Sequence, residues 1–353
     1  SGALAPFIGG FDWAFLKGIS VSDLSPYFIS HSQTGPDGAS VGTIPHLLFI
    51  MFQCMFAVIT PALILGAFAE RIRFKGFLLF TVLWALLVYN PVAHWVWSGD
   101  GWLFKLGALD CAGGTVVHIN AGIAALITAV MLGKRRDYQG HAIPPHNIPH
   151  VFIGAALLWF GWFGFNAGSA LAANELAVKA FLNTNLASAT AMVTWMLTDG
   201  ARGKKRSVVG AAVGAVVGLV AITPSAGFVT VGQSIFIGCT ASLVSYFATR
   251  LKSRSSIDDT LDVFPCHGIG GITGMILTGV FAENVGLIYG DPTVFLYHLL
   301  ALLIVGAFTF GGSFLLYKLT DLILPMRVTE IQEERGLDIT QHGELATDVP
   351  SSY

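Results

Sequence analysis

Two histidines in matching positions, each within strongly apolar sequence, are the residues most suited to chemistry in this chain. Each copy of the pattern has an aspartate, then seven residues, a histidine, then three residues and a glycine. The residues are Asp110, His118 and Gly122 in the first copy and Asp259, His267 and Gly271 in the second. An ionisable group at bilayer depth costs roughly 2.5 kcal/mol or more, so it is rarely there without a role. Two satisfied core histidines remain the simpler alternative.

The composition indicates the environment of these histidines. Hydrophobic residues make up 54% of the chain and charged residues 11%, with a mean hydropathy of +0.69. A soluble domain has about 25% charged residues, so we predict an all-α polytopic membrane protein. The 41 glycines suit close helix packing. The four cysteines form no paired metal or redox motif, and no cofactor or metal is expected: Cys54, Cys111, Cys239 and Cys266.

Nine apolar segments approach the ~20 residues that a helix needs to cross a bilayer. They cover residues 44–68, 75–96, 113–132, 149–167, 176–199, 207–223, 228–250, 263–282 and 293–321. The sixth is the shortest. We therefore predict a loop over residues 1–43, a transmembrane domain over 44–321 and a polar tail over 322–353.

The distribution of Lys and Arg predicts the orientation of these spans. One set of alternate loops is rich in these residues: Arg71, Arg73 and Lys75; Lys134, Arg135 and Arg136; Arg202, Lys204, Lys205 and Arg206; Arg250, Lys252 and Arg254; and Arg327 and Arg335 in the tail. The opposite set has Lys17, Lys105 and Lys179. The basic loops are expected in the cytoplasm, with the N-terminus outside and the C-terminus inside, in a multi-pass protein of the cell membrane.

This topology relates the two histidines to each other. His118 is on the third span and His267 on the eighth, so the two copies run in opposite directions through the membrane. Such an inverted repeat is typical of transporters, with the functional groups meeting near the bilayer midplane. A repeat unit of five helices would place two further helices before residue 44, and the chain is expected to lack them at its N-terminus.

Several motifs resemble those of the ammonium transporter family (Amt/MEP/Rh), on its Amt branch, along essentially the whole chain. The matching segments are Ala69–Phe74, Gly107–Asp110, Gly113–Gly122, Gly161–Ser169, Asp262–Gly268 and Gly336–Glu344. The resemblance implies ammonium or ammonia transport, with methylammonium as an analogue, in a fold of eleven helices arranged as an inverted five-plus-five repeat plus one. It also implies a homotrimer, a role in nitrogen uptake, and a cytoplasmic PII-type protein or a kinase as regulator.

The resemblance assigns roles to aromatic, hydroxyl and histidine side chains. Phe56, Trp97 and Ser169 match the outer site that recruits the cation, Phe56 and Phe165 match the stacked rings that close the pore, and His118 and His267 match the paired pore histidines. An aromatic face attracts ammonium by about 0.5–2 kcal/mol, and a hydroxyl can accept one of its hydrogen bonds. From position alone, Trp97 would be an interfacial tryptophan, and the phenylalanines would be ordinary packing residues.

Polar residues at the span ends have a structural interpretation beside the functional one. Asp110 is interpreted as a buried acceptor near a helix start that also makes the outer mouth electronegative; its alternatives are a simple N-cap or a cation ligand. Asp262 matches a family position near the inner mouth, although capping is its commonest role. In the tail, Gly336, Asp338 and Thr340 match a regulatory segment, with a disordered terminus as the alternative.

Other functional classes were compared with this one. The chain has no His-Glu-x-x-His or Gly-x-Ser-x-Gly motif, and neither pore histidine has a carboxylate partner within the membrane, so an enzyme is not expected. A metal transporter would need carboxylates or thiolates at depth, for which Cys266 beside His267 is a weak indication. An ammonium sensor on the same fold, or an inactive truncated variant, stays open as an alternative.

Overall fold

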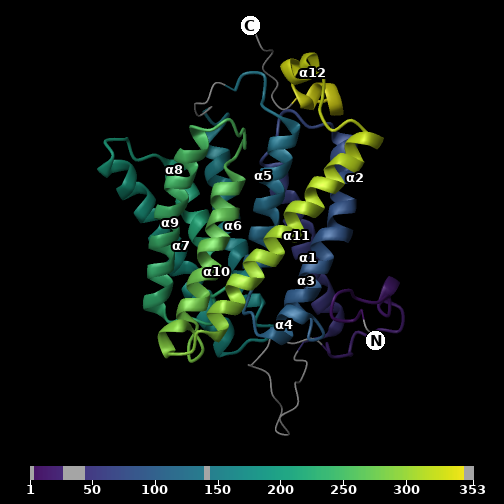
Figure 1. Ribbon diagram of the computed structural model, residues 1–353. Helices are drawn as coiled ribbons and strands as arrows, with labels where there is room; N and C mark the ends of the chain where they lie inside the picture. The colour runs from purple at the N-terminus through teal and green to yellow at the C-terminus, as the bar shows by residue number, and fades with distance from the viewer. Residues whose placement is uncertain (1–3, 27–43, 139–143, 346–353) are drawn as a thin grey trace.

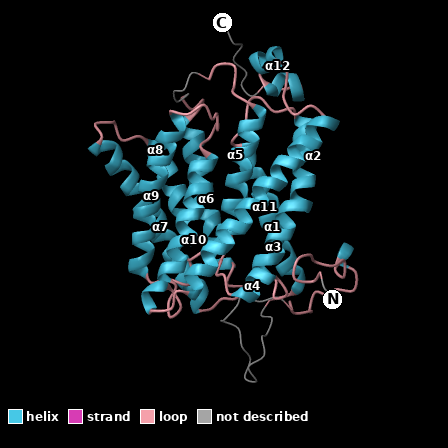
Figure 2. Ribbon diagram, in the orientation of Figure 1, coloured by secondary structure: helices cyan, strands magenta, loops and turns pink. Residues whose placement is uncertain are grey.

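Long helices run side by side through most of the chain in this computed structural model, which describes residues 4–26, 44–138 and 144–345 (Figure 1). Within these ranges Figure 2 shows helices and loops but no strands, and the β-type contacts are two isolated bridges, Leu24 with Pro45 and Ile72 with Arg327. The predicted all-α class is confirmed. Parts of the two predicted terminal segments, residues 1–3, 27–43 and 346–353, lie outside the described residues.

The helices follow the predicted apolar segments closely. In chain order they are α1 (His46–Leu65), α2 (Phe74–Trp84) with a π-helical turn η2 (Ala85–Tyr89) and α3 (Asn90–Trp97), α4 (Trp102–Leu106), η3 (Gly114–Ile119) with α5 (Asn120–Leu132), α6 (Ile148–Gly168), α7 (Glu175–Ala201), α8 (Val208–Ile222), α9 (Val231–Ser253), η4 (Phe264–Ile269) with α10 (Gly270–Phe281), α11 (Thr293–Ile323), and in the tail α12 (Glu330–Arg335) and η6 (Asp338–His342). Short 3-10 turns occur at Ala14–Leu16 and Leu287–Tyr289.

All nine predicted spans are helical, but they differ in length and in hydropathy. Seven helical stretches of the described chain are long and apolar enough to cross a membrane. The sixth predicted span, α8, has 15 residues and is the shortest, as expected. The fifth, α7, has 27 residues but carries polar residues that lower its hydropathy; its buried Asn183, Thr184 and Ser188 form hydrogen bonds to neighbouring residues.

Side-chain caps define where several helices begin. Asn147, Asn174 and Ser207 accept backbone N–H groups at the starts of α6, α7 and α8. Thr230 and Gln233 form a reciprocal capping box at the start of α9. Such caps satisfy N–H groups that the first helical turn leaves without partners.

Glycines allow the helices of the second half to approach each other closely. A Cβ at Gly218 of α8 or at Gly238 of α9 would overlap the backbone of Ala187 on α7. Because small residues let backbones meet without a hydrophobic drive between helices in lipid, this packing explains part of the high glycine content.

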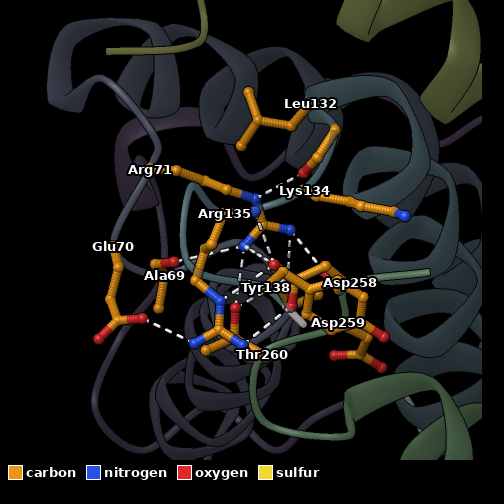
Figure 3. Close-up of polar contacts among 12 residues, drawn as sticks. Ala69, Glu70, Arg71, Leu132, Lys134, Arg135, Tyr138, Asp258, Asp259 and Thr260 are labelled. Carbon is orange, nitrogen blue, oxygen red and sulfur yellow. Dashed lines mark hydrogen bonds and ion pairs between the residues drawn. The ribbon is translucent and has the colours of Figure 1, made fainter. Parts of the chain in front are cut away.

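Three of the four predicted basic loops meet at one end of the bundle, where the tail also contacts them, and Figure 3 shows the polar contacts among the loops. Arg71, with no exposed surface, donates to the backbone oxygens of Gly133 and Asp258 at 2.8 and 2.5 Å. Arg327 from the tail donates to the oxygens of Leu132 and Lys134 at 2.9 and 2.6 Å. Segments far apart in sequence are therefore on the same side, as the alternation of Lys and Arg predicts.

Candidate pore and recruitment site

Both pore-histidine candidates lie in π-helical turns at the starts of spans. His118 is in η3 and His267 is in η4, and each turn continues into an α-helix. Single π-helical turns within α-helices are rare and occur frequently at functional sites. The sequence repeat therefore corresponds to a repeated irregularity of the backbone.

The aspartate of each copy accepts hydrogen bonds from backbone N–H groups at the start of the π-helical turn that contains the histidine. Asp110 accepts the N–H groups of Gly113, Gly114 and Thr115 at 2.6–2.8 Å. Asp259 accepts the N–H groups of Val263 and Phe264 at 3.0 and 2.7 Å. This is the arrangement expected of a helix cap, and it sets the position of each histidine along its helix.

The glycine of each copy allows the two histidine-bearing segments to cross. A Cβ at Gly122 would overlap the backbone of Gly268, and a Cβ at Gly271 would lie 3.1 Å from Cβ of His118. The glycine four residues after each histidine thus meets the segment that carries the other histidine. The two segments run antiparallel, as an inverted repeat requires.

The two imidazole rings are in direct contact. Nδ1 of His118 and Nδ1 of His267 are 3.2 Å apart, and the ring centroids are 5.3 Å apart. His118 has no exposed surface and His267 has 8%. Since a neutral imidazole has one donor and one acceptor nitrogen, one Nδ1 carries the shared proton and the other accepts it. The Nε2 atom of His118 has no hydrogen-bond partner among the described residues.

A row of aromatic rings leads from the histidine pair toward the end of the helix bundle that lies opposite the basic loops. The ring of Phe165 is stacked on His118 at 5.9 Å, and Phe56 is 4.6 Å from Phe165. The ring of Trp97 is 5.2 Å from Phe56. Phe56 is 2% exposed, so its ring is buried between the cavity and Phe165.

A cavity of about 330 Å³ lies on the side of these rings away from the basic loops, and its lining includes Phe56, Trp97, Asp110 and Ser169. The indole N–H of Trp97 donates to the backbone oxygen of Asp110 at 3.0 Å. The hydroxyl of Ser169 donates to the backbone oxygen of Phe165 at 2.8 Å, which leaves its oxygen available to accept a hydrogen bond. The three residues expected to recruit the cation therefore share one cavity.

The remaining predicted residues lie at the opposite end of the bundle. Asp262 has a left-handed backbone (φ 56°) and forms an ion pair with Lys252 at 2.7 Å. Gly336, also left-handed (φ 91°), ends α12, and Thr340 Oγ1 donates to its backbone oxygen at 2.7 Å. A second cavity, of about 560 Å³, lies between the tail and the loops, and Asp338 is part of its lining.

The tail is tied to the loop after α5 by charged side chains. Glu333 accepts the backbone N–H of Arg136 at 2.7 Å and a guanidinium N–H of Arg327 at 2.9 Å. Glu334 accepts a guanidinium N–H of Arg136 at 2.5 Å. The short helix α12 is thus held against the loop after α5 rather than extended away from the bundle.

One residue of the site was not selected from the sequence. Trp162 is stacked on His118, with ring centroids 5.4 Å apart and an angle of 14°, and its indole N–H donates to Thr223 Oγ1 at 2.9 Å. It lies within the recognised motif Gly161–Ser169, one helical turn before Phe165. That spacing places Trp162 and Phe165 on the same face of α6 and could have revealed it.

Comparisons with known proteins agree with this architecture. The family model described as Ammonium Transporter Family matches residues 2–347. An ammonium transporter of Bacillus subtilis (strain 168) is 49% identical over 355 residues, covering 98% of this chain and 84% of the relative. The crystal structure of Candida albicans Mep2 is 39% identical, with a TM-score of 0.79, covering 83% of this chain and 69% of Mep2.

A structure titled "Sensor Amt Protein" is also similar, with 31% identity, a TM-score of 0.78, and coverage of 83% of this chain and 76% of that one. The family match extends over almost the whole chain. The 49% identity to the B. subtilis relative is also much higher than the identity of proteins that share only a fold. The chain belongs to the Ammonium Transporter Family and is a multi-pass membrane protein of a transporter family, not of a family of enzymes.

Proposed function

We propose that this protein transports ammonium nitrogen across the membrane along the line from the outer cavity, past Phe56 and Phe165, to His118 and His267. The observation that carries this proposal is the continuity of that line. The cavity ends at Phe56, the next ring is Phe165, and Phe165 is stacked on the first histidine. A polar pair behind aromatic rings in an apolar bundle is the arrangement that a conduit for neutral ammonia would require.

The outer cavity is suited to gathering a small cation. The faces of Trp97 and Phe56 supply cation–π attraction, worth about 0.5–2 kcal/mol. Ser169 supplies a hydroxyl oxygen as acceptor, since its own proton is donated to Phe165. Asp110, 8% exposed, uses its carboxylate for backbone N–H groups, so it contributes negative potential rather than a direct ligand.

The closed rings provide selectivity against metal cations. Ammonium resembles potassium in charge and nearly in size, but ammonium can lose a proton to the water of the solution outside the rings. Transfer of an unpaired charge into an apolar medium is very costly, so a potassium ion cannot pass the rings, whereas ammonia carries no charge. The histidine pair then offers a polar line within the apolar path, with donor and acceptor roles set by the shared proton.

The orientation and domain limits follow from the same proposal. The end with the cavity, including the described part of residues 1–43, faces the outside, and the end with Arg71, Arg135 and the tail faces the cytoplasm. Residues 44–321 are the transport domain, and residues 322–353 form a cytoplasmic regulatory tail. The contacts of Glu333 and Glu334 with Arg136 support a tail that acts on the transport domain.

Assembly and regulation are further parts of the proposal. The family resemblance supports a homotrimer that serves nitrogen uptake, with a PII-type protein or a kinase acting at the tail. Thr340 is the residue that a kinase would modify. Its hydroxyl is engaged with the backbone oxygen of Gly336, so a phosphate there would replace a structural hydrogen bond.

The direct test is flux through the purified full chain in liposomes. An inward ammonium gradient is applied, and internal pH and methylammonium uptake are followed, with potassium as the competing cation. We expect ammonium-dependent flux and no potassium conduction. Saturable binding of methylammonium without flux would instead identify a sensor, the function named for one structural neighbour.

A further inference from the structure

One corner of the cytoplasmic end is strongly basic. We define the basic corner as six residues: Arg202, Lys204, Lys205, Arg206, Arg250 and Arg254. The first four lie in the six-residue loop between α7 and α8, residues 202–207, which contains no carboxylate and whose residues are all exposed. The guanidinium of Arg202 lies over the ring of Phe247, 5.6 Å from its centroid, so the loop reaches the last turns of α9, where Arg250 and Arg254 follow.

These cations differ from the arginines near the tail. Arg135 is paired with Asp258 and Glu70, Arg136 with Glu334, and Arg327 with Glu333. In the described ranges no side chain of the basic corner has a carboxylate oxygen within 4.0 Å. The carboxylate of Asp199, in the last turn of α7, is buried and accepts the hydroxyl of Tyr246 at 3.0 Å. Tyr246 in turn accepts a guanidinium N–H of Arg250 at 3.3 Å, so Asp199 is linked to one of the six cations, and most of the positive charge of this corner is not paired with a carboxylate in the described chain.

Apolar side chains continue directly from the basic corner along the helices. Leu197 of α7, Val208 of α8, and Phe247 and Leu251 of α9 are 58%, 50%, 50% and 73% exposed. The rest of the described chain leaves these side chains uncovered, and in a multi-pass membrane protein such a face is open to acyl chains. The start of α8 adds the positive end of a helix dipole beside the loop. A surface with cations above and exposed apolar side chains below matches a phospholipid rather than an acidic soluble protein.

We propose that the basic corner binds the headgroup of an anionic phospholipid in the adjacent leaflet. The phosphate lies among the loop cations and the arginines of α9, and the acyl chains lie against Leu197, Phe247 and Leu251. The general excess of Lys and Arg on cytoplasmic loops does not account for this site, because other arginines at the same end are neutralised by carboxylates. The lipid supplies the missing anion.

The test compares lipid binding by the full chain and two variants with equal charge loss. The first variant is Lys204→Gln, Lys205→Gln and Arg206→Gln. The control is Lys75→Gln, Lys134→Gln and Lys318→Gln, which removes three exposed lysines from three different elements. Binding of phosphatidylglycerol and of phosphatidylcholine is measured in detergent by native mass spectrometry. Because each basic residue at an anionic surface contributes several-fold in affinity, the loop variant should bind phosphatidylglycerol about tenfold more weakly or worse.

The control variant should lose less than about threefold, since its charges do not belong to one site. Phosphatidylcholine binding should be the same in all three proteins, which also verifies folding. For the wild type, phosphatidylglycerol affinity should fall as salt rises, because salt screens exposed charges. Equal losses in both variants, or full displacement of the lipid by inorganic phosphate, would overturn the proposal. Unchanged lipid binding in the loop variant would do the same and leave the surface to an acidic protein.

Discussion

Arg135 and Asp258 form a two-pronged ion pair between loops 123 residues apart, with Nε–Oδ2 and Nη2–Oδ1 distances of 3.0 and 2.9 Å (Figure 3). The backbone N–H of Arg135 donates to the same carboxylate at 2.7 Å, and Arg71 lies 3.9 Å from it. Burial alone would raise the pKa of Asp258, but the hydrogen bonds and charge of Arg135, with the charge of Arg71, lower it below its ordinary value. This pair joins the loop after α5 to the loop that leads to His267.

Asp258→Asn should destabilise the protein strongly. The change leaves Arg135 and Arg71 without their shared buried anion, and breaking a buried pair costs about 3 kcal/mol. Thermal unfolding in detergent measures the effect. The matched control is Glu70→Gln, because Glu70 also pairs with Arg135 but its side chain is 63% exposed, and its loss should cost less than about 1 kcal/mol.

The contribution of Asp258 should also depend on pH in a defined direction. Its pKa in the folded protein lies below the unfolded value near 3.9. The stabilisation is therefore fully present above about pH 3.9 and is lost as pH falls through the lower folded value. Asp258→Asn should cost less in acid than at neutral pH. An identical cost at both would show that ionisation of Asp258 is not what stabilises the loops.

His118→Asp and His267→Asp should each weaken discrimination between ammonium and potassium. A fixed carboxylate stabilises a cation that cannot deprotonate, whereas the imidazole pair holds one shared proton between neutral rings. Flux of both cations through liposomes is the measurement. His298→Gln serves as a control for the loss of another buried histidine. The ring of His298 forms hydrogen bonds with the backbone of Leu109 and Met275 and is not part of the row of rings at the proposed pore. Wild-type flux and selectivity in either aspartate variant would remove the pair from the mechanism.

Trp97→Leu should reduce the apparent affinity for methylammonium several-fold, because it removes a cation–π face worth about 0.5–2 kcal/mol and the indole bond to Asp110. The concentration dependence of uptake checks this. Trp95→Leu is the comparison, since Trp95 lies two residues away and packs on Phe308 at 4.6 Å instead of on Phe56. Equal effects of the two substitutions would indicate a general packing role for both tryptophans.

The proposed orientation can be checked by cysteine labelling of intact cells. A Cys54→Ala background removes the exposed native thiol, and Lys17→Cys or Lys134→Cys then adds one exposed thiol at either end. An impermeant maleimide should label position 17 and spare position 134 until the cells are opened. The reverse pattern would invert the protein and place the recruitment cavity in the cytoplasm.

Thr340→Asp should depress transport by the intact assembly. A negative charge there lies near Asp338 and Glu344, and the substitution removes the hydroxyl bond to Gly336. Gly336→Asp should have the same effect, because Gly336 has φ 91° and a side chain there is strained. Thr340→Ser, which keeps the hydroxyl, is the control. If deletion of residues 330–353 left transport and regulation unaltered, the tail would be a passive terminus.

The positions of the spans and the pairing of the histidines could be predicted from the sequence. Crossing a bilayer depends on apolar length and on loop charge, and both are local properties of the chain. The repeated aspartate, histidine and glycine indicated an inverted repeat because the two copies lie on spans of opposite direction. The resemblance to the family placed the remaining candidates, among them Phe56, Trp97 and Ser169.

Only the tertiary structure decided which of these side chains meet. Whether Phe56 touches Phe165, or Trp162 covers His118, depends on how each helix is rotated and where helices cross. The rotation and the crossing of the helices are set by packing against neighbours, for example where Gly122 meets Gly268. A span that is apolar on all sides does not show in its sequence which side of the helix packs on protein and which side faces lipid. The same holds for charges: the sequence shows many arginines, but folding pairs Arg135 with Asp258, whereas the cations of the loop after α7 have no carboxylate oxygen within 4.0 Å in the part of the chain that the structure describes.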